Sequence, residues 1–542
     1  MRAFGTFRAI LSNREIRRAE LAWTLGVGAE WAWVITLLVY ANQAAGVFAV
    51  GLVGLGRTVP AALVAPFVTA LTDRFPRHRV LLAMHAGRAA FLAAAVVAIV
   101  ADAPIVLVYA VAVLEGMLAT IHRPANNSLL PGLARSPEEL VAGNAVASTM
   151  EGVGVLVGPA IAGLLVAAGG PALGAALATG SFVTAAGVIS LVETTRFTPP
   201  PSGGHVRDAL AGLRTLRTHR MASVLVGLFS LQTFVRGLLT VLIVGAAVGP
   251  LGLGNGGVGY LNAAIGAGGL IGAVAALGLI GRRTLGLPFT VSLAVWGAPI
   301  ALIGLLPTAP AALAFLATVG IANAVLDVSG FSLIQRIVPN EVRGRVFGAM
   351  EGIFALMVGL GSLVAPALIG ILGVGGALVL AGLILPIAAV LSAPLVRRAD
   401  AAAVLPEQEL ALLRSIPFFA PLPMTSLEAL AAAMTVRHVP AGTTLIREGE
   451  PGDHFHILSS GSARVSVDGK LVREIGPGEG VGEIALLRDV PRTATVTLLE
   501  EAEVYDLGRD AFLEAVTGSR HSLVAADAIA RGRVGTLGTT DR

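Results

Sequence analysis

Apolar runs about 20 residues long recur between residues 20 and 396, and they restrict the fold of this chain more than any other feature. A run of that length is about what an α-helix needs to cross the apolar part of a bilayer. The chain is 55% hydrophobic and only 13% charged, so it lacks the polar surface that a soluble protein of 542 residues requires. The sequence therefore predicts a polytopic α-helical membrane protein.

The connections between these runs alternate in charge. Arginines occur in the connections that follow every even-numbered run, whereas the connections after the odd-numbered runs contain neither arginine nor lysine. By the positive-inside rule, both chain termini are expected in the cytoplasm. The pattern predicts twelve transmembrane helices, at about 20–42, 46–71, 80–100, 104–122, 141–168, 171–193, 221–248, 256–280, 286–306, 310–331, 346–372 and 374–396.

Several classes of protein are disfavoured by composition and motifs. The chain has no cysteine, so it has neither disulfides nor a thiol-ligated metal site. Residues 1–405 hold 25 Arg and Lys against 15 Asp and Glu, whereas residues 406–542 hold 13 against 19. The basic excess thus belongs to the short membrane loops and does not indicate a nucleic-acid partner. The only lysine, Lys470, is not in a phosphate-binding loop, so we expect no ATP hydrolysis and no enzyme activity. The first 19 residues contain five arginines but no apolar run followed by a small-residue cleavage site, so we expect no cleavable signal peptide.

A short sequence recurs two hundred residues apart. Met150–Gly152 and Met350–Gly352 are both Met-Glu-Gly, each follows a Ser-Leu pair, and each precedes a glycine-rich span that contains a proline. Two such halves, at about 20–193 and 221–396, indicate a duplication. Six helices related to six others is the architecture of many secondary carriers.

Residues 1–396 resemble a major facilitator superfamily carrier. Asp73–Arg79 matches the loop that this superfamily has between its helices 2 and 3, although Thr69 or Ala70 stands where a glycine usually leads the motif. Arg123–Pro131, with Leu140–Asn144 after it, is similar to the branch of macrolide and siderophore exporters. The resemblance implies a central cavity lined by helices 1, 4, 7 and 10.

Four charged residues fall on those cavity helices. A charge near the bilayer centre costs on the order of 2.5–3.5 kcal/mol, so each needs a reason. We expect Glu30 and Glu115 to be titratable sites for proton coupling, with Arg236 as counter-ion or substrate contact. The alternative is a structural ion pair, for instance Glu115 with Arg57 or Arg88. A conformational latch is expected from the charges near the cytoplasmic helix ends and the loop after helix 2, namely Asp73, Arg74, Arg77, Glu151, Asp327 and Glu351.

Uncharged polar residues are few in the predicted spans. The resulting cavity is largely apolar, which suits a lipophilic or amphipathic small molecule better than a sugar. The polar residues that we expect there are Asn42, Gln43, Gln232, Asn262 and Asn323.

The sequence after residue 396 changes character. Residues 397–415 predict a helical linker, and residues 436–507 alternate apolar and polar in short runs broken by glycines. Such a pattern is typical of a small antiparallel barrel or jelly roll. Helices are expected on both sides of it, at 425–434, 509–516 and about 521–531, and residues 531–542 are expected to be disordered.

The stretch from Gly478 to Thr497 carries the chemistry of this tail. Gly482 permits a tight turn, Glu483 can accept a ribose hydroxyl, and Ile484–Leu486 can begin a helix whose free amides favour a phosphate. Arg492 can pair with phosphate oxygens in a contact worth roughly 1.5–3 kcal/mol. The alternative is a surface loop in which Glu483 and Arg492 form a salt bridge.

Residues 416–530 resemble a cyclic-nucleotide-binding domain, most clearly at Gly482–Leu486 and Pro491–Thr495. The resemblance implies that Glu483 binds the ribose 2′-hydroxyl, while Arg492 and the Ala485 amide bind the cyclic phosphate. It also implies that Thr493 and Ala494 border the base, that Val465 and Val467 form the floor of its pocket, and that a helix near Leu523 covers it. The expected ligand is cAMP, with cGMP possible because Thr493 supplies a hydroxyl.

The sequence thus predicts an exporter-like secondary carrier of the bacterial inner membrane that a cyclic nucleotide regulates. Its expected partners are the lipid bilayer, the nucleotide and a small-molecule substrate, with no cofactor. Three alternatives remain: a cyclic-nucleotide exporter, a lipid or lysolipid transporter, and a receptor that does not transport.

Overall fold

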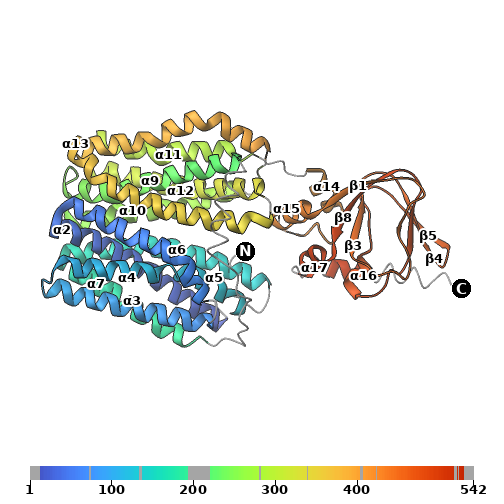
Figure 1. Ribbon diagram of the computed structural model, residues 1–542, viewed down its shortest axis with the longest axis horizontal. Helices are drawn as coiled ribbons and strands as arrows, with labels where there is room; N and C mark the ends of the chain where they lie inside the picture. Colours follow the sequence, from blue (N-terminus) through green and yellow to red (C-terminus); the bar gives the residue numbers. More distant parts are fainter. Residues whose placement is uncertain are drawn as a thin grey trace. The chain divides into compact units, whose positions relative to one another are not determined.

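The computed structural model describes residues 13–72, 75–133, 137–192, 220–279, 282, 284–338, 340–402, 407–422, 424–517, 522 and 524–529. The chain divides into two compact units, Met1–Ala403 and Val404–Arg542. Helices make up the described part of the N-terminal unit, whereas short helices accompany two β-sheets in the C-terminal unit (Figure 1).

Helix starts in the N-terminal unit often coincide with proline. Pro76 and Pro104 immediately precede α3 and α4, and Pro171 is the first residue of α7. Proline suits these places because the first amides of a helix have no partner within it. The helices are α2 (Arg14–Thr72), α3 (Arg77–Val100), α4 (Ile105–Ala119), α5 (His122–Leu133), α6 (Pro137–Gly169), α7 (Pro171–Ser190), α9 (Arg220–Val248), α10 (Gly254–Ala276), the 3-10 turn η1 (Leu277–Leu279), α11 (Gly286–Leu305), α12 (Ala309–Ile337) and α13 (Asn340–Ala402).

Ten helices in the described ranges are long and apolar enough to cross a membrane. Two of them contain about 50 residues, and each is interrupted by a glycine with positive φ. Gly46 has φ 71° in α2, and Gly373 has φ 67° in α13. Both glycines allow the left-handed backbone that a side chain disfavours. The interruptions fall between the spans predicted to end near residues 42 and 372 and the spans that follow them.

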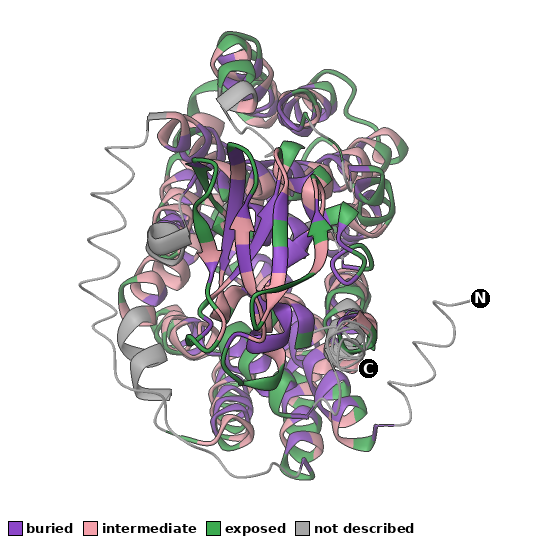
Figure 2. Cartoon of the chain, turned by 90° about the vertical axis from the view of Figure 1, so that its right-hand side faces the viewer, coloured by how far each residue is buried: buried purple, intermediate pink, exposed green. Residues whose placement is uncertain are grey.

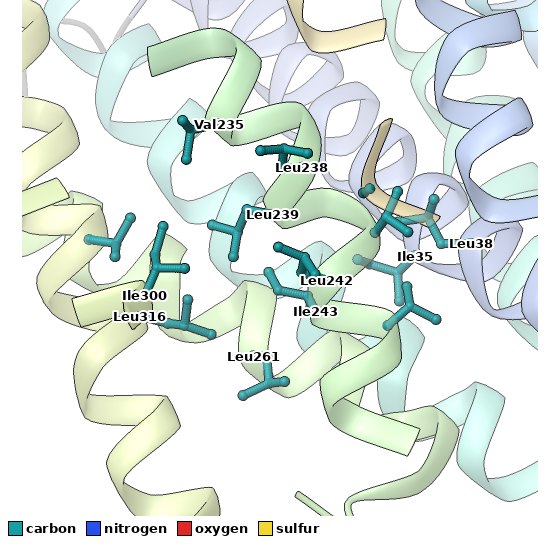
Figure 3. Packing of buried hydrophobic residues seen from close by; sticks show 14 of the residues in the cluster. Ile35, Leu38, Val235, Leu238, Leu239, Leu242, Ile243, Leu261, Ile300 and Leu316 are labelled. Carbon is teal, nitrogen blue, oxygen red and sulfur yellow. The ribbon is translucent and has the colours of Figure 1, made fainter. Parts of the chain in front are cut away.

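The helices form two groups. In the first, α2 packs against α4, α6 and α7, and α3 packs against α4 and α7; in the second, α13 packs against α9 and α11, and α12 against α10 and α11. Contacts of α6 with α10 and of α2 with α13 join the groups. Leucine, isoleucine and valine fill the shared core, where α9 contributes Val235, Leu238, Leu239, Leu242 and Ile243 (Figure 3).

Glycines allow close approach of helices. A Cβ on Gly154 would lie 2.9 Å from Val27 Cγ1, and a Cβ on Gly158 would collide with the backbone of Gly28. Small residues therefore let α6 contact the backbone of α2.

The C-terminal unit contains eight strands in two four-stranded antiparallel sheets, ordered β1-β8-β3-β6 and β2-β7-β4-β5. Their strands are mostly buried or half-buried while the loops are exposed (Figure 2). This confirms the predicted β-fold of the tail. The strands are β1 (Thr435–Val439), β2 (Thr444–Ile446), β3 (His454–Leu458), β4 (Ala463–Val467), β5 (Lys470–Ile475), β6 (Gly480–Val481), β7 (Thr495–Leu498) and β8 (Ala502–Gly508).

Short helices complete this unit through an aromatic core. Phe418 and Phe419 follow the helix Glu407–Ser415. They contact Phe455 of β3 and Phe512 of the helix Arg509–Thr517, with ring centroids 5.6–6.0 Å apart. The predicted helix near 521–531 is described only at residues 522 and 524–529, and Leu523 and residues 531–542 lie outside the described ranges. The helices are α14 (Glu407–Ser415), α15 (Met424–Ala433), α16 (Glu483–Arg488) and α17 (Arg509–Thr517).

Candidate functional site

A pocket opens in the C-terminal unit beside the sheet β2-β7-β4-β5. It holds about 550 Å³ of empty space, counted to its open mouth. Apolar side chains form most of its wall, and four side chains with polar groups join them: Arg473, Glu483, Arg492 and Thr493. Apolar lining with a few convergent polar groups is typical of small-molecule sites. The apolar residues of the wall are Ile446, Val465, Val472, Val481, Ile484, Ala485, Ala494 and Val496.

Gly482 sets the geometry of one wall. Its φ of 99° turns the chain from β6 directly into α16, which begins at Glu483. A Cβ at position 482 would collide with Nη1 of Arg492 and lie 3.1 Å from the His454 carbonyl oxygen. Only glycine fits here without strain, and Glu483, which is 1% exposed, follows at the pocket wall.

Arg492 is held by backbone carbonyls. It donates one hydrogen bond to the Gly482 oxygen at 3.1 Å and another to the His454 oxygen at 2.7 Å. Burial lowers the pKa of Arg492, while the carboxylates of Asp453 and Glu483 act in the opposite direction. A guanidinium stays charged even so, and a largely buried cation at the wall of an apolar pocket suits an anion.

The structure adds one polar residue, Arg473, to the predicted set and leaves one predicted residue outside the pocket. A β-bulge between β4 and β5 places Val465 opposite Arg473 and Ser466 opposite Leu471, and both Val472 and Arg473 line the pocket. Strand alternation alone would turn one of these neighbours away, so sequence periodicity did not indicate Arg473. Val465 lines the pocket as predicted, whereas Val467 is not among the lining residues.

A His–Asp–Arg chain, in which His456 and Asp506 are buried and Arg437 is exposed, braces β3. Asp506 of β8 contacts Nδ1 of His456 at 2.6 Å and accepts a hydrogen bond from Arg437 of β1 at 2.5 Å. Burial lowers the pKa of His456 despite its hydrogen bond to Asp506. Burial would raise the pKa of Asp506, but the hydrogen bonds from His456 and Arg437 outweigh it and lower that pKa. These contacts fix the strand whose His454 carbonyl holds Arg492.

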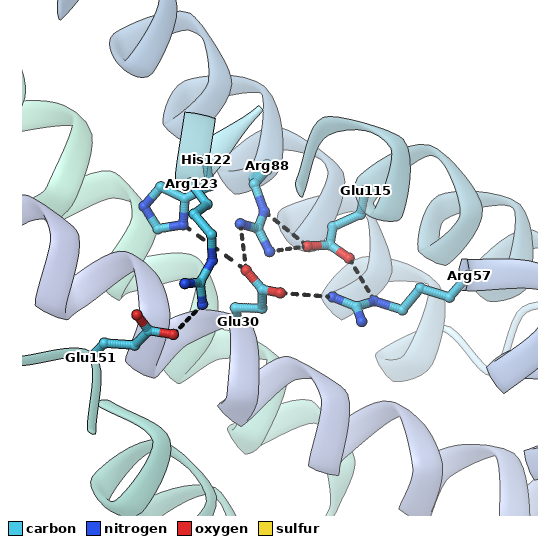
Figure 4. Close-up of polar contacts among 7 residues, drawn as sticks. All are labelled: Glu30, Arg57, Arg88, Glu115, His122, Arg123 and Glu151. Carbon is cyan, nitrogen blue, oxygen red and sulfur yellow. Dashed lines mark hydrogen bonds and ion pairs between the residues drawn. The ribbon is translucent and has the colours of Figure 1, made fainter. Parts of the chain in front are cut away.

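A second polar site lies among the long helices. Glu115 of α4 and Arg88 of α3 are fully buried and form an ion pair, and Arg57 of α2 reaches Glu115 at 3.3 Å (Figure 4). Glu30 of α2 lies 3.2 Å from Arg88 and 3.5 Å from Arg57. The four residues therefore form a closed network of two carboxylates and two guanidiniums. Both pairings offered for Glu115 as a structural alternative occur together.

Comparison with known proteins assigns both units. The profile of the Major Facilitator Superfamily matches residues 22–357, more than half of the chain. The chain belongs to the major facilitator superfamily. It is a multi-pass membrane protein of the transporter class, and the profile of the cyclic nucleotide-binding domain matches residues 436–518 of its C-terminal unit.

Curated relatives match the C-terminal domain of this superfamily member. A "cAMP-dependent protein kinase regulatory subunit" of Yarrowia lipolytica is 40% identical over 102 residues, and a "cGMP-dependent protein kinase" of Eimeria tenella is 40% identical over 107 residues. These matches cover 18% and 20% of this chain, and 27% and 11% of the relatives. The solved regulatory domain of Toxoplasma gondii PKA with cAMP is 39% identical, with 20% of this chain and 42% of that chain covered and a TM-score of 0.19.

Two histidines at the buried network of this transporter were not predicted. Nδ1 of His122 lies 4.0 Å from Glu30, and the ring of His85 lies 5.1 Å from that of His122. The sequence did carry a signal, since His85 stands in a predicted span three residues before Arg88.

The remaining predicted transport residues lie on the other helix group. Asp327 of α12 accepts a hydrogen bond from Asn323 at 2.8 Å, and its charged neighbours are Arg236, Arg123 and Glu351. Arg236 is therefore associated with Asp327 and does not join the network around Glu30.

The predicted latch is only partly described. Glu151 forms an ion pair with Arg123, a partner that the prediction had not named (Figure 4). Glu351 is exposed, and Arg77 begins α3. Asp73 and Arg74 lie outside the described residues.

Proposed function

We propose that this chain is a secondary active transporter regulated by a cyclic nucleotide, which binds its C-terminal domain and shifts its transport cycle. The observation that carries the proposal is the pocket in which Glu483 and Arg492 share a wall with apolar side chains. Its ligand is a purine 3′,5′-cyclic monophosphate. The phosphate pairs with Arg492, the ribose hydroxyl with Glu483, and the base lies against Val465 and Val472.

The base wall bears on the choice between cAMP and cGMP. Arg473 and Thr493 both line it and both carry hydrogen-bond donors. Guanine presents two acceptors, O6 and N7, to which a guanidinium binds in bidentate fashion, whereas adenine has a donor in place of O6. Arg473 is 3.0 Å from Glu479, so the carboxylate already orients it. This supports cGMP as a ligand at least as good as cAMP, the nucleotide expected from sequence.

A route from the pocket to the linker exists within the C-terminal unit. Ser415 of α14 donates a hydrogen bond to the Gly478 oxygen at 3.0 Å, just before β6 and the Gly482 turn. At its other end, Gln408 donates to Ser459 at 3.0 Å and to Glu503 at 3.2 Å. Ligand binding at the Gly482 turn can therefore move α14, the helix that follows the carrier in sequence. Such a link is what a coupling free energy between two sites requires.

The helix arrangement supports twelve crossings with both termini in the cytoplasm. Each of the two long helices, α2 and α13, has enough residues for two crossings and a glycine break between them. Residues expected on the same side also meet: Asn13 donates to the Leu133 oxygen, and Arg336 donates to the Arg282 oxygen. With the arginine-rich loops inside, this placement suits a bacterial inner membrane.

The transport residues support proton-coupled export of a lipophilic or amphipathic molecule. Glu30 is 30% exposed in a network whose other carboxylate, Glu115, is fully buried, so Glu30 is the carboxylate that protons and substrate can reach. Gln232 and Trp296 both donate hydrogen bonds to Oδ1 of Asn323, which leaves fewer polar groups for a sugar.

Equilibrium binding tests the sensor directly. Purified full-length protein should bind cAMP or cGMP saturably, and Arg492→Ala should weaken binding at least tenfold, since a charge-assisted contact is worth about 1.5–3 kcal/mol. Arg488→Ala is the matched control, because it removes an exposed arginine four residues away that does not line the pocket. Equal affinity in all three proteins would reject this site, and absence of binding to the unmodified chain would reject the sensor.

Three rival functions make different predictions. A cyclic-nucleotide exporter would move labelled cAMP or cGMP out of loaded vesicles, and a lipid transporter would move a fluorescent lysolipid between leaflets. If the protein is a receptor that does not transport, the Glu30→Gln variant should behave like the unmodified protein in every phenotype. Under our proposal, Glu30→Gln abolishes transport that responds to a pH gradient while nucleotide affinity is unchanged.

A further inference from the structure

Several buried polar atoms between α2, α3 and α5 have no hydrogen-bond partner among the described residues. They are both carboxylate oxygens of Glu20, Nδ2 of Asn126, Nε2 of His122 and Nδ1 of His85. All four residues are at most 5% exposed. Buried polar groups in native proteins nearly always bind a protein group or an ordered water molecule. Four such groups in one region of one helix bundle therefore point to a shared ligand.

His122 stands at the inner end of this set. Its Nδ1 lies 4.0 Å from Oε2 of Glu30, while its Nε2 is the atom without a partner (Figure 4). The ring packs 4.5 Å from that of Trp23, and a Cβ on Gly26 would come within 2.8 Å of both His122 and His85. The imidazole thus presents one nitrogen to Glu30 and leaves the other for a further partner.

The register of α2 and α5 places the other two groups. Asn13 of α2 meets Leu133 of α5 at one end, and Trp23 meets His122 ten residues further along α2, so the two helices run antiparallel. Asn126 is one turn from His122, and Glu20 is one turn from Trp23. Both therefore lie at the same level between the two contacts. The polar groups form a row that leads from Glu30 toward the end of the bundle where Asn13 and Leu133 meet.

We propose that water molecules bound to Glu20, Asn126 and His122 form a proton conduit between Glu30 and this end of the bundle. The inference rests on the proton coupling proposed above and adds its route. In one transfer, Nε2 of His122 accepts a proton from the adjacent water molecule, which takes a proton in turn from the next water of the row, so that the net proton enters at the end of the bundle. Nδ1 of His122 gives its own proton to the Glu30 carboxylate. The imidazole holds one proton before and after, in opposite tautomers, and the reverse transfer empties Glu30. Buried water suits the row because each molecule needs two to four polar partners.

The charges around the conduit explain why proton delivery would matter. Glu30 faces Arg57, Arg88 and His122, and His122 also faces Arg88, Arg123 and His85. Glu30 forms ion pairs with both arginines. A proton that arrives through His122 neutralises Glu30 and so releases an arginine of α2 or α3 from one of its two partners. Helix contacts around the network can then change.

The test follows protonation of Glu30 in substrate-free, full-length protein in lipid bilayers. A flash releases protons from a caged acid, and time-resolved infrared spectra report the carboxyl band that Glu30→Gln removes. Glu20→Gln, His122→Gln and Asn126→Leu should each slow the appearance of this band at least tenfold and leave its final amplitude unchanged. His122→Gln keeps the size and a hydrogen-bonding group but cannot pass a proton between two nitrogens.

Matched controls separate the conduit from general damage. Glu15→Gln changes a carboxylate on the same helix that pairs with Arg18, and Asn127→Leu removes an exposed amide next to Asn126 on α5. Both controls should keep the original rate. If the three conduit variants also keep it, the conduit is wrong while proton coupling stands. If the Glu30 band never appears between about pH 4 and 10, both the coupling and its conduit are wrong.

Discussion

Gly482 shows how a single backbone angle organises the nucleotide pocket. We expect Gly482→Ala to weaken cyclic-nucleotide binding at least tenfold, because the φ of 99° strains any side chain by about 1–2 kcal/mol and the new Cβ collides with Arg492. Calorimetric titration of the full-length protein measures this. Gly476→Ala is the control, because nothing lies within 4 Å of its added Cβ. An unchanged dissociation constant in Gly482→Ala would contradict the assigned role of the turn.

His456 and Asp506 make the nucleotide-binding domain sensitive to acid. Both have a pKa lowered in the folded state, from ordinary values of 6.5 and 3.8, so the unfolded state binds more protons as the pH falls. The stability that each group contributes to the folded domain is therefore present at a pH above its ordinary pKa and is lost as the pH falls below it. We therefore expect β3 and β8 to lose stability as the pH drops below about 6.5 through His456, and again below about 3.8 through Asp506.

Hydrogen exchange of β3 and β8 amides in the full-length chain, corrected for the intrinsic pH effect, measures that loss. His456→Gln should remove most of the pH dependence between pH 7.5 and 5.5. His438→Gln on β1 should not, because that ring is 73% exposed. The same pH dependence in all three proteins would show that another group titrates.

At the scale of single residues, the sequence predicted site residues that stand close together in the chain. Gly482, Glu483 and Arg492 stand in one short stretch, so the sequence predicted them together, and the structure places all three at the pocket. Arg473 could not be found this way because a bulge turns it toward the pocket. The buried position of His122 Nε2, which has no hydrogen-bond partner among the described residues, could not be predicted because its surroundings come from helices distant in sequence.

The buried charge network joins elements instead of stabilising one helix. Arg88 of α3 bridges Glu30 of α2 and Glu115 of α4. We expect Arg88→Leu to destabilise the carrier by about 3–5 kcal/mol, because it leaves buried carboxylates with one arginine. The double variant Arg88→Leu/Glu115→Leu should recover part of that loss, since it removes a charge of each sign.

Thermal unfolding in lipid nanodiscs measures both variants. Arg464→Leu removes an exposed pair of the C-terminal unit and should cost less than about 1 kcal/mol. If the double variant loses as much unfolding free energy as Arg88→Leu and Glu115→Leu lose together, Arg88 and Glu115 do not act as a pair.

Helices and strands were predictable to the extent that their periodicity is local. The expected helices at 425–434 and 509–516 correspond to Met424–Ala433 and Arg509–Thr517, and the segment predicted as an antiparallel barrel or jelly roll forms two antiparallel sheets. The pairing β1-β8-β3-β6 was not predictable, because strand order depends on contacts between distant segments. The path of α5 beside α2 escaped sequence reasoning for the same reason.

At the scale of the whole molecule, the proposal requires two separable activities in one chain. Glu30→Gln should abolish transport driven by a pH gradient in proteoliposomes, because the protonatable carboxylate is lost. Nucleotide affinity should stay within about twofold, since Glu30 and the nucleotide pocket belong to different units. Retained gradient-driven transport in Glu30→Gln would assign proton coupling to another group.

The absence of cysteine makes regulation directly measurable, because spin labels can be attached at introduced cysteines without background. Labels at Gly132→Cys of α5 and Gln335→Cys of α12 report the separation of the two helix groups by pulsed electron resonance. Saturating cyclic nucleotide should shift the distance distribution in this protein and leave it unchanged when Arg492→Ala is added. Saturable nucleotide binding with identical distance distributions in its presence and absence would contradict a transporter whose cycle is set by this domain.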